Sequence, residues 1–302
     1  MAMMSGPHLF TRPAKEPLEA VMTWYEVAAR ALPWRSDPEP WAVLVSEVML
    51  QQTPVARVLP VFESWMTRWP TPTDLATDSP GEAIRAWGRL GYPRRALRLH
   101  AAAVACRDHF AGAVPSDVTD LRTLPGVGEY TASAVAAFGF GQRQAVLDTN
   151  VRRVHARWLD GLEHPGTAAP NNGERQRALN LLPDDPPVAA LASISVMELG
   201  ALVCTSRTPD CDVCPLLTSC AWRSAGYPAW SGAPRRRQSY EGTDRQCRGR
   251  LLDILRRAGS TVSKDDLDRA WTDVDQRERA LSSLIKDGLV NGTPTSGYRL
   301  PD

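Results

Sequence analysis

Four of the chain's six cysteines lie close together in the segment "CTSRTPDCDVCPLLTSC", residues 204 to 220. They are spaced C-x6-C-x2-C-x5-C and are Cys204, Cys211, Cys214 and Cys220. In a reducing compartment, clustered cysteines are more often metal ligands than disulfides. Four thiolates could hold a tetrahedral zinc ion or an iron–sulfur cluster. Only Cys211 and Cys214 have the short spacing of a zinc knuckle, so the pattern favours a cluster over zinc.

Two acidic residues stand where a carboxyl group could do acid–base or electrostatic chemistry. Glu47 is the one acidic residue in the apolar segment from Trp41 to Leu50. Apolar surroundings favour the protonated carboxyl, which can then deliver a proton to a leaving group. A buried glutamate without a function would be costly unless it faced water. Asp148 comes just before a predicted helix that begins near Asn150, where its ordinary role would be that of an N-cap.

A glycine-rich turn is a candidate phosphate-binding element. In "LPGVGEYTASAVAAF", residues 124 to 138, Gly126 and Gly128 precede an alanine-rich helix. Two glycines permit a tight turn whose backbone N–H groups, together with the positive end of the helix, form a seat for an anion. A simple tight turn is the alternative interpretation.

Arginine clusters supply local positive charge, although the formal net charge is only +1. Three clusters could each meet phosphates: Arg94, Arg95 and Arg98; Arg152, Arg153 and Arg157; and Arg235, Arg236 and Arg237. For any single cluster, a solvated helix face is the alternative.

The elements that must position these residues are predicted to be mostly helical. We expect an N-terminal tail over residues 1–17 and a main domain over residues 18–224, with no convincing strands. The helices are expected near residues 18–30, 41–56, 58–68, 81–87, 94–109, 118–122, 129–140, 150–159, 173–181, 187–202 and 212–218. The 302 residues are 43% hydrophobic and 23% charged, which suits one large or two modest globular domains.

A stretch rich in Gly, Pro, Ser and Arg, residues 225–244, is predicted to link the main domain to a smaller module. Residues 245–302 are expected to form three amphipathic helices and a hairpin around an Asn-Gly turn, the ingredients of a winged-helix-like module. Its third helix would carry Gln276, Arg277 and Arg279 outward, the position from which such modules contact DNA. The alternative is that the module packs against the main domain or a partner.

The ends and apolar runs of the sequence indicate a cytoplasmic location. The N-terminal segment lacks the basic and apolar regions of a secretory signal, and no later apolar run is long enough to span a bilayer. We therefore expect no membrane partner.

Several segments, taken in their order along the chain, resemble the MutY-type adenine DNA glycosylases of the endonuclease III superfamily. They cover roughly residues 18 to 222 and are "LPWR" at 32–35, "SEVMLQQT" at 46–53, Gly91-Tyr92, the "LPGVG" turn, the Asp148 segment, "MELGALVC" at 197–204 and the cysteine loop. The resemblance implies a two-lobed helix-hairpin-helix glycosylase fold whose residues 204–220 hold a [4Fe–4S] cluster. It also implies removal of adenine paired with 8-oxoguanine or guanine, after the base is flipped out of double-stranded DNA.

The resemblance assigns roles to four residues of the reaction site. Glu47 matches the general acid that protonates the five-membered ring of adenine, and Asp148 matches the carboxylate that stabilises the oxocarbenium-like sugar. Tyr130 and Asn150 match polar residues that support the site.

DNA-binding residues are implied in the same way. Gln52 and Tyr92 match residues that fill the gap near the orphaned base. The remaining predicted DNA contacts lie in the "LPWR" segment, the glycine turn and the cysteine loop, and they are Arg35, Gly126, Val127, Gly128 and Arg207. We expect a monomer that associates with the nucleoid when it is bound to DNA.

The distribution of lysine argues against lyase chemistry independently of the resemblance. A Schiff-base lyase needs an amine, and lysine occurs only as Lys15, Lys264 and Lys286. Tyr130 occupies the position where bifunctional relatives place the imine-forming lysine. A monofunctional glycosylase is therefore predicted.

Two departures from the family pattern leave other functions to be weighed. The chain has Asp148-Thr149-Asn150 where the family usually has Asp-Gly-Asn, and its short C-terminal module stands where typical members carry a larger Nudix-like domain. One alternative is a thymine or uracil mismatch glycosylase of the same superfamily, which would not need Glu47 to protonate a purine. The other is a non-catalytic helix-hairpin-helix DNA-binding protein, for which acids in the pocket would be of no use.

Overall fold

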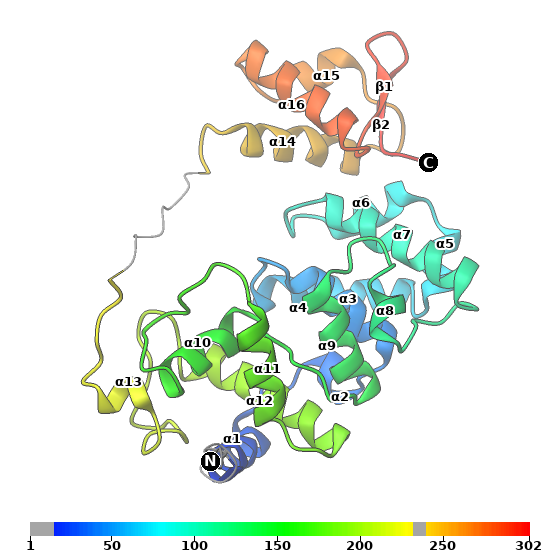
Figure 1. Cartoon of the computed structure of the whole chain (residues 1–302). Helices are drawn as coiled ribbons and strands as arrows, with labels where there is room; N and C mark the ends of the chain where they lie inside the picture. The colour runs from blue at the N-terminus through cyan, green and yellow to red at the C-terminus, as the bar shows by residue number, and fades with distance from the viewer. Residues whose placement is uncertain (1–14, 232–239) are drawn as a thin grey trace, which may run out of the picture. The chain divides into compact units, whose positions relative to one another are not determined.

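The computed structural model describes residues 15–231 and 240–302, and nearly all of its regular structure is helical (Figure 1). The chain divides into two units, residues 1–36 with 132–233 and residues 37–131 with 234–302. Each unit is therefore built from two separate stretches of the sequence. Within the described residues, no helix is long and apolar enough to cross a membrane.

The first unit is built around three packed helices. Its helices are α1 (Lys15–Ala28), α2 (Pro33–Ser36), α10 (Thr149–Trp158), α11 (Asn172–Leu181), α12 (Pro186–Leu202) and α13 (Ala221–Ser224). Helices α1 and α10 both pack on α12. Val21, Val154 and Leu199 are almost fully buried in this core, and burying aliphatic side chains of this size supplies the main stabilisation, about 1.5–3 kcal/mol each.

The starts of these helices follow from their sequence. Asp148 caps α10 by accepting the N–H of Val151, and Asp185 caps α12 by accepting the N–H of Val188. Helix α11 has a full capping box between Asn171 and Glu174. Each cap satisfies N–H groups that the helix itself cannot pair.

The second unit contains the other helices of residues 37–131. They are α3 (Pro40–Leu50), α4 (Val55–Arg68), α5 (Pro72–Thr77), α6 (Pro80–Trp87), α7 (Arg94–His109) and α8 (Val118–Leu121). Trp65 lies edge-on to both Trp69 and Trp87, with ring centroids 4.6 and 5.7 Å away. This aromatic cluster ties α4 to the end of α6. Helix α9 (Glu129–Phe140) crosses the boundary between the two units.

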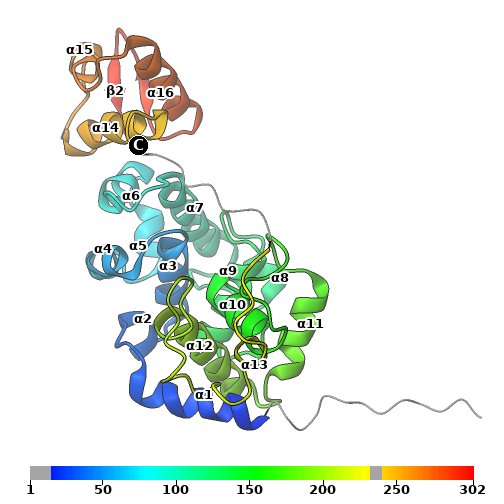
Figure 2. The ribbon, with the colours of Figure 1, turned by 90° about the vertical axis from the view of Figure 1, so that its left-hand side faces the viewer.

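The C-terminal part of the second unit contains three helices and a hairpin (Figure 2). The elements are α14 (Asp244–Arg257), α15 (Lys264–Asp268), α16 (Val274–Lys286), β1 (Asn291–Thr293) and β2 (Gly297–Arg299). The two strands are antiparallel, and an isolated bridge joins Val262 to Tyr298. Helices α14 and α16 pack together over buried leucines such as Leu251 and Leu284. We call residues 240–302 the C-terminal module.

The prediction of a mostly helical fold is confirmed, but not every helix is where the sequence indicated. The helix expected over 41–56 ends at Leu50, because Pro54 disfavours helical backbone at Thr53 and Gln52 adopts a positive φ of 55°. The helix expected at 212–218 is wrong, since that segment forms successive turns between cysteines. The short helices α2, α5 and α13 were not predicted. Much of the tail expected over residues 1–17 lies outside the described residues, and α1 begins at Lys15.

The structure also corrects the predicted arginine surfaces. Arg95, Arg152, Arg153 and Arg157 are all buried, so four of the six described arginines of these clusters cannot present solvated cations to phosphate. Arg277 is buried as well and donates to the carbonyls of Asp268 and Trp271, so the expectation that it faces outward from the third helix is wrong. Arg235, Arg236 and Arg237 lie outside the described residues.

Candidate functional site

Glu47 lies in a helix that is buried on all sides. Every residue of α3 from Trp41 to Met49 is buried, and Glu47 itself is 7% exposed. The polar Ser46 beside it is satisfied within the helix, because its hydroxyl donates to the carbonyl of Val43 at 2.8 Å. The structure thus confirms that Glu47 is buried, in a helix whose other buried residues are apolar except Ser46.

A buried arginine organises the chain that leaves α3. Arg95 of α7 donates from one guanidinium to six acceptors at the end of α3 and in two loops: the carbonyls of Val48, Met49, Gln51, Leu90 and Gly91 and the hydroxyl of Thr53. The distances run from 2.6 Å to Gln51 to 3.5 Å to Leu90. Burial lowers the pKa of Arg95 to about 10, which still leaves the group charged near neutral pH.

The two loops that Arg95 joins carry Gln52 and Tyr92. Both residues have positive φ, 55° and 47°, a backbone conformation that costs energy for residues other than glycine. Both side chains are exposed, Tyr92 by 43%. The guanidinium of Arg95 lies 5.6 Å from the centre of the Tyr92 ring. The second unit therefore holds two polar or aromatic side chains outward on a rigid, strained support.

The glycine turn is well formed and only partly as predicted. Gly126 has a φ of 85°, and a Cβ there would lie 2.8 Å from the Cβ of Arg98, so the position requires glycine. Val127 is buried and its N–H donates to the carbonyl of Leu124 at 3.1 Å. Its predicted contribution to anion binding therefore has no support in its own geometry. Gly128 is exposed and precedes the first turn of α9, which begins at Glu129 and contains Tyr130.

Asp148 is held in place by two hydrogen bonds to its carboxyl group. The N–H of Val151 donates to one oxygen at 2.6 Å, and the side-chain amide of Asn150 donates to the other at 2.8 Å. Burial raises the pKa of Asp148 above its ordinary value, although these hydrogen bonds and the charge of Arg153 act in the opposite direction. The carboxyl is thus fixed in orientation and titrates at higher pH than a free aspartate.

Arg153 connects the Asp148 segment to the cysteine loop within the first unit. Its guanidinium donates to the side-chain oxygen of Asn150 at 2.8 Å, to the carbonyl of Gly200 at 2.6 Å and to the carbonyl of Cys204 at 2.8 Å. Helices α10 and α12 approach closely here, because a Cβ on Gly200 would lie 2.8 Å from the Cβ of Asn150.

The four cysteines of residues 204–220 line one pocket. Arg157 also lines it, and its guanidinium lies 3.4 Å from the sulfur of Cys204 and donates to the carbonyls of Thr205 and Ser206. Burial raises the pKa of Cys214 to about 11, with the neighbouring cysteines acting in the same direction. Four thiolates at this place would therefore need positive charge beside them. Among residues 15–231 and 240–302, no group of three or more His, Cys, Asp or Glu is placed to hold a single metal ion.

Arg207 and Arg35, two further predicted DNA contacts, have different surroundings. Arg207 is exposed in the cysteine loop. Arg35 is 11% exposed at its side chain and pairs with Glu198 at 2.9 Å, which is not the environment of a surface phosphate contact.

Glu198 is a buried charge in the "MELGALVC" segment for which the sequence predicted no separate role. It is fully buried and accepts two side-chain hydrogen bonds from Arg30, at 2.7 and 2.6 Å, besides the one from Arg35. Burial by itself would raise the pKa of Glu198, but these bonds outweigh it and lower the pKa to about 2. The sequence pattern that could have identified Glu198 is the one that identified Glu47, a single acidic residue in an apolar helix.

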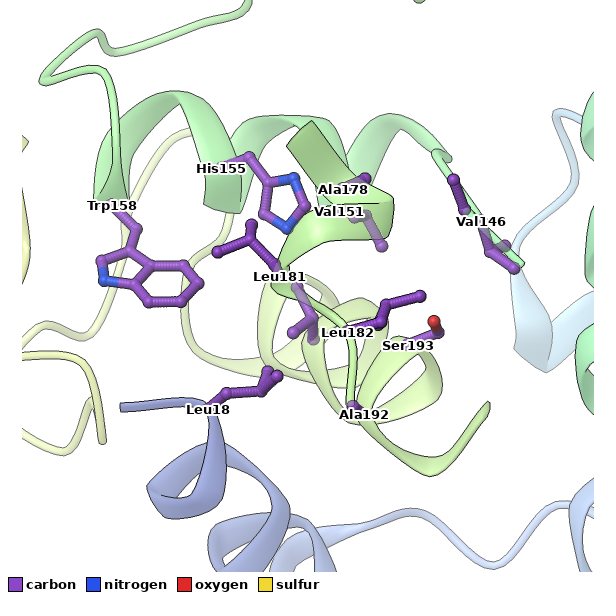
Figure 3. A pocket seen from close by; sticks show the side chains of 12 residues that line it. Leu18, Val146, Val151, His155, Trp158, Ala178, Leu181, Leu182, Ala192 and Ser193 are labelled. Atoms are coloured by element: carbon purple, nitrogen blue, oxygen red, sulfur yellow. The ribbon is translucent and has the colours of Figure 1, made fainter. Parts of the chain in front are cut away.

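The first unit also contains an apolar pocket that lacks the chemistry of a reaction site (Figure 3). Its lining includes Leu18, Trp158 and Leu182, with His155 and Ser193 as polar members. Burial lowers the pKa of His155 to about 4, so the imidazole is neutral at ordinary pH. The pocket contains no carboxyl group.

Comparison with known proteins agrees with these features. The family model of the HhH-GPD superfamily base excision DNA repair proteins matches residues 45–168. The adenine DNA glycosylase of Mycobacterium tuberculosis (strain ATCC 25618 / H37Rv) is 53% identical over 284 residues, which cover 93% of this chain and 92% of that protein. The adenine DNA glycosylase of Mycolicibacterium smegmatis is 49% identical over 282 residues, 93% of this chain and 94% of that protein.

Solved structures support the fold. A thermostable thymine-DNA glycosylase matches with a TM-score of 0.64 and 24% identity, over 70% of this chain and 97% of that one. A non-covalent endonuclease III–DNA complex matches with a TM-score of 0.58 and 25% identity, over 69% of this chain and 94% of that one. The helix-hairpin-helix glycosylase fold expected from the sequence is confirmed.

Proposed function

The chain belongs to the adenine DNA glycosylases of the HhH-GPD superfamily, and from that premise we propose that it removes adenine paired with 8-oxoguanine or guanine. It is a base excision repair enzyme whose substrate is DNA. The proposal extends this to the opposite base, to the residues that carry the reaction and to its purely hydrolytic course, with the enzyme acting as a cytoplasmic monomer.

The observation that carries the proposed mechanism is a pair of carboxyl groups, Glu47 buried in α3 and Asp148 held by two hydrogen bonds. Glu47 is buried in apolar α3, which suits it to hold a proton until adenine needs it. Protonation of a nitrogen in the five-membered ring of adenine turns a poor anionic leaving group into a neutral one. The C–N bond then breaks, its electron pair goes to the base, and the sugar becomes an oxocarbenium-like cation.

Asp148 is suited to stabilise that cation. Its two hydrogen bonds, from Val151 and Asn150, fix the carboxylate before reaction, so no reorganisation is needed as positive charge develops. Water then adds to the sugar carbon and loses a proton, which restores the acid form of Glu47 and leaves a neutral abasic site. Tyr130 and Asn150 are proposed to support the site through polar contacts.

The absence of a suitable amine supports a monofunctional enzyme. The sequence has no lysine between Lys15 and Lys264, so no lysine of this region can form an imine with the opened sugar. Borohydride should therefore trap no covalent protein–DNA adduct.

We propose a [4Fe–4S] cluster for the cysteine loop. The four cysteines line one pocket, and only Cys211 and Cys214 have the short spacing of a zinc knuckle, which favours a multi-atom cluster over zinc. A bound cluster would supply positive iron beside Cys211 and Cys214, whose pKa values burial raises, and would fix the shape of the loop that carries Arg207. Iron and sulfide analysis of the purified protein tests this, and stoichiometric zinc in place of iron would contradict it.

The substrate is tested by incubating the full-length protein with duplexes that contain A:8-oxoG, A:G, T:G or U:G, followed by alkali. We expect strand scission after alkali for the first two duplexes and none above background for the others. Scission of T:G or U:G in preference to A:8-oxoG would favour the thymine or uracil alternative. Binding to all four duplexes without release of any base would favour a non-catalytic DNA-binding protein.

A further inference from the structure

The C-terminal module contacts α6 and α7 through reciprocal arginines. Arg85 of α6 donates to the carbonyls of Arg256 and Ala258, at the end of α14. Arg256 of α14 donates in return to the carbonyl of Ile84 at 3.0 Å. Each arginine thus satisfies carbonyl groups near the C-terminal, negative end of the other helix.

Further contacts extend this docking surface. Arg89 pairs with Asp253 at 3.1 Å, and Arg94 pairs with Asp287 at 3.4 Å. Residues 300 and 301 approach α6 at Gly81, which is buried: a Cβ there would lie 2.3 Å from the carbonyl oxygen of Pro301. A backbone group cannot move aside as a flexible side chain can, so glycine at this position permits the contact.

The same docking places Arg245 over the ring of Tyr92. Arg245 lies in the first turn of α14, and its guanidinium carbon is 4.7 Å from the centre of the Tyr92 ring. Arg95 approaches the same ring at 5.6 Å, and Arg245 also lies 5.8 Å from the ring of Tyr240. Tyr92 therefore has one cation from α7 and one from the module, both within the range of cation–π attraction.

We propose that Arg245 is a positioning residue, which holds the ring of Tyr92 ready to enter the gap beside the orphaned base. The module then acts on DNA recognition through Tyr92 rather than through its third helix. Of the two arginines expected on that helix to contact DNA, Arg277 is buried, and only Arg279, whose side chain is 61% exposed and lies 3.6 Å from Asp244, faces solvent. The role of Tyr92 at DNA rests on the proposed function, whereas the docking does not.

Docking is tested without DNA by hydrogen exchange on full-length Gly81→Ala. Alanine normally favours a helix over glycine by about 1 kcal/mol, but here it would displace the end of the module. We expect faster exchange in residues 88–95 and in α14. Gly259→Ala is the control, since that position lies in the module with nothing within 4 Å of a Cβ. Wild-type exchange in Gly81→Ala would overturn the docking.

The role of Arg245 is tested by a double-mutant cycle with Tyr92→Leu. The ligand is a duplex with a tetrahydrofuran abasic site opposite 8-oxoguanine, which needs no catalysis. We expect Arg245→Ala to weaken binding about 3- to 10-fold, a loss typical of one cation–π contact, and to have less than a twofold effect when Tyr92 is already leucine. Arg250→Ala, an exposed arginine of the same helix, should change affinity by less than twofold.

Arg245→Ala could instead weaken binding equally whether residue 92 is tyrosine or leucine, and lower by about 1 the slope of log affinity against log salt concentration. That result would show that Arg245 binds a phosphate directly and would overturn the proposal. These outcomes stay separate from the substrate assignment. A protein that releases no adenine from any duplex would contradict the proposed function, while the exchange experiment would still decide whether the module docks.

Discussion

Asp148 meets two opposing demands on one carboxyl group. It must be ionised to stabilise a sugar cation, yet burial raises its pKa above 3.8, the ordinary value for aspartate. The hydrogen bonds from Val151 and Asn150 act against that rise. The pKa of Asp148 in the folded protein is therefore set by a balance between burial and two named donors.

That balance predicts a pH dependence of the chemical step. The ionised form is lost as pH falls through the raised pKa, so the single-turnover rate should decline on the acid side at higher pH than for an ordinary aspartate. Asn150→Ala removes a donor that lowers the pKa, and its acid limb should move to still higher pH. Asn171→Ala, a cap of α11, should leave the profile unchanged. An acid limb that shifts downward in Asn150→Ala would contradict this account.

The proposed role of Glu47 as the general acid depends on a proton that an amide cannot supply. Glu47→Gln keeps the size of the side chain but cannot supply a proton. General acid catalysis typically contributes about 10²- to 10⁴-fold to a rate, so we expect a single-turnover loss of that size on an A:8-oxoG duplex, with duplex affinity changed little. Glu63→Gln, on the exposed surface of α4, is the matched control and should keep the wild-type rate. A near-normal rate for Glu47→Gln would exclude Glu47 as the acid.

At the scale of elements, the first unit depends on a buried ion pair between α2, α12 and the chain after α1. Glu198 is fully buried, and Arg30 and Arg35 both pair with it. Removing one partner of such a group leaves charge unpaired and typically costs about 3–5 kcal/mol. The pair therefore holds together three segments of the chain, one of which is far from the others in sequence.

Glu198→Gln should lower Tm by roughly 10 °C, given about 2–4 °C per kcal/mol for a chain of this size. Asp160→Asn is the matched control, because it breaks an exposed pair with Arg177 and should change Tm far less. Thermal unfolding of both variants beside the wild type gives the comparison. A Tm for Glu198→Gln within about 2 °C of the wild type would show that the buried pair does not stabilise the unit.

The helices were predicted from the sequence more accurately than the loops between them. Long periodic helices such as α7 and α12 were predicted almost to their ends, because spacing and caps encode them locally. The outward position of Gln52 was not predicted, since the chain beside it is held by Arg95, which lies 43 residues after Gln52. Long-range contacts of this kind leave no local pattern.

For the whole molecule, the main error of the sequence-based prediction was to place arginines at the surface that the structure buries. A cluster such as Arg152, Arg153 and Arg157 has the same sequence pattern whether it faces phosphate or caps internal carbonyls. The sequence did identify Glu47 as buried, because a helix that is apolar on every side buries a lone acid together with its neighbours. It could not place Arg245 beside Tyr92, since roughly 150 residues separate them, a distance along the chain that no periodicity bridges.

Hydrolytic release of adenine by this chain is tested by mass analysis of the products from one turnover on an A:8-oxoG duplex. We expect free adenine in a 1:1 ratio to duplex, with the strand intact until alkali is added and no adduct after borohydride. Strand cleavage without alkali together with a trapped adduct would contradict the hydrolytic mechanism. Retention of adenine while a T:G duplex loses thymine would contradict the substrate.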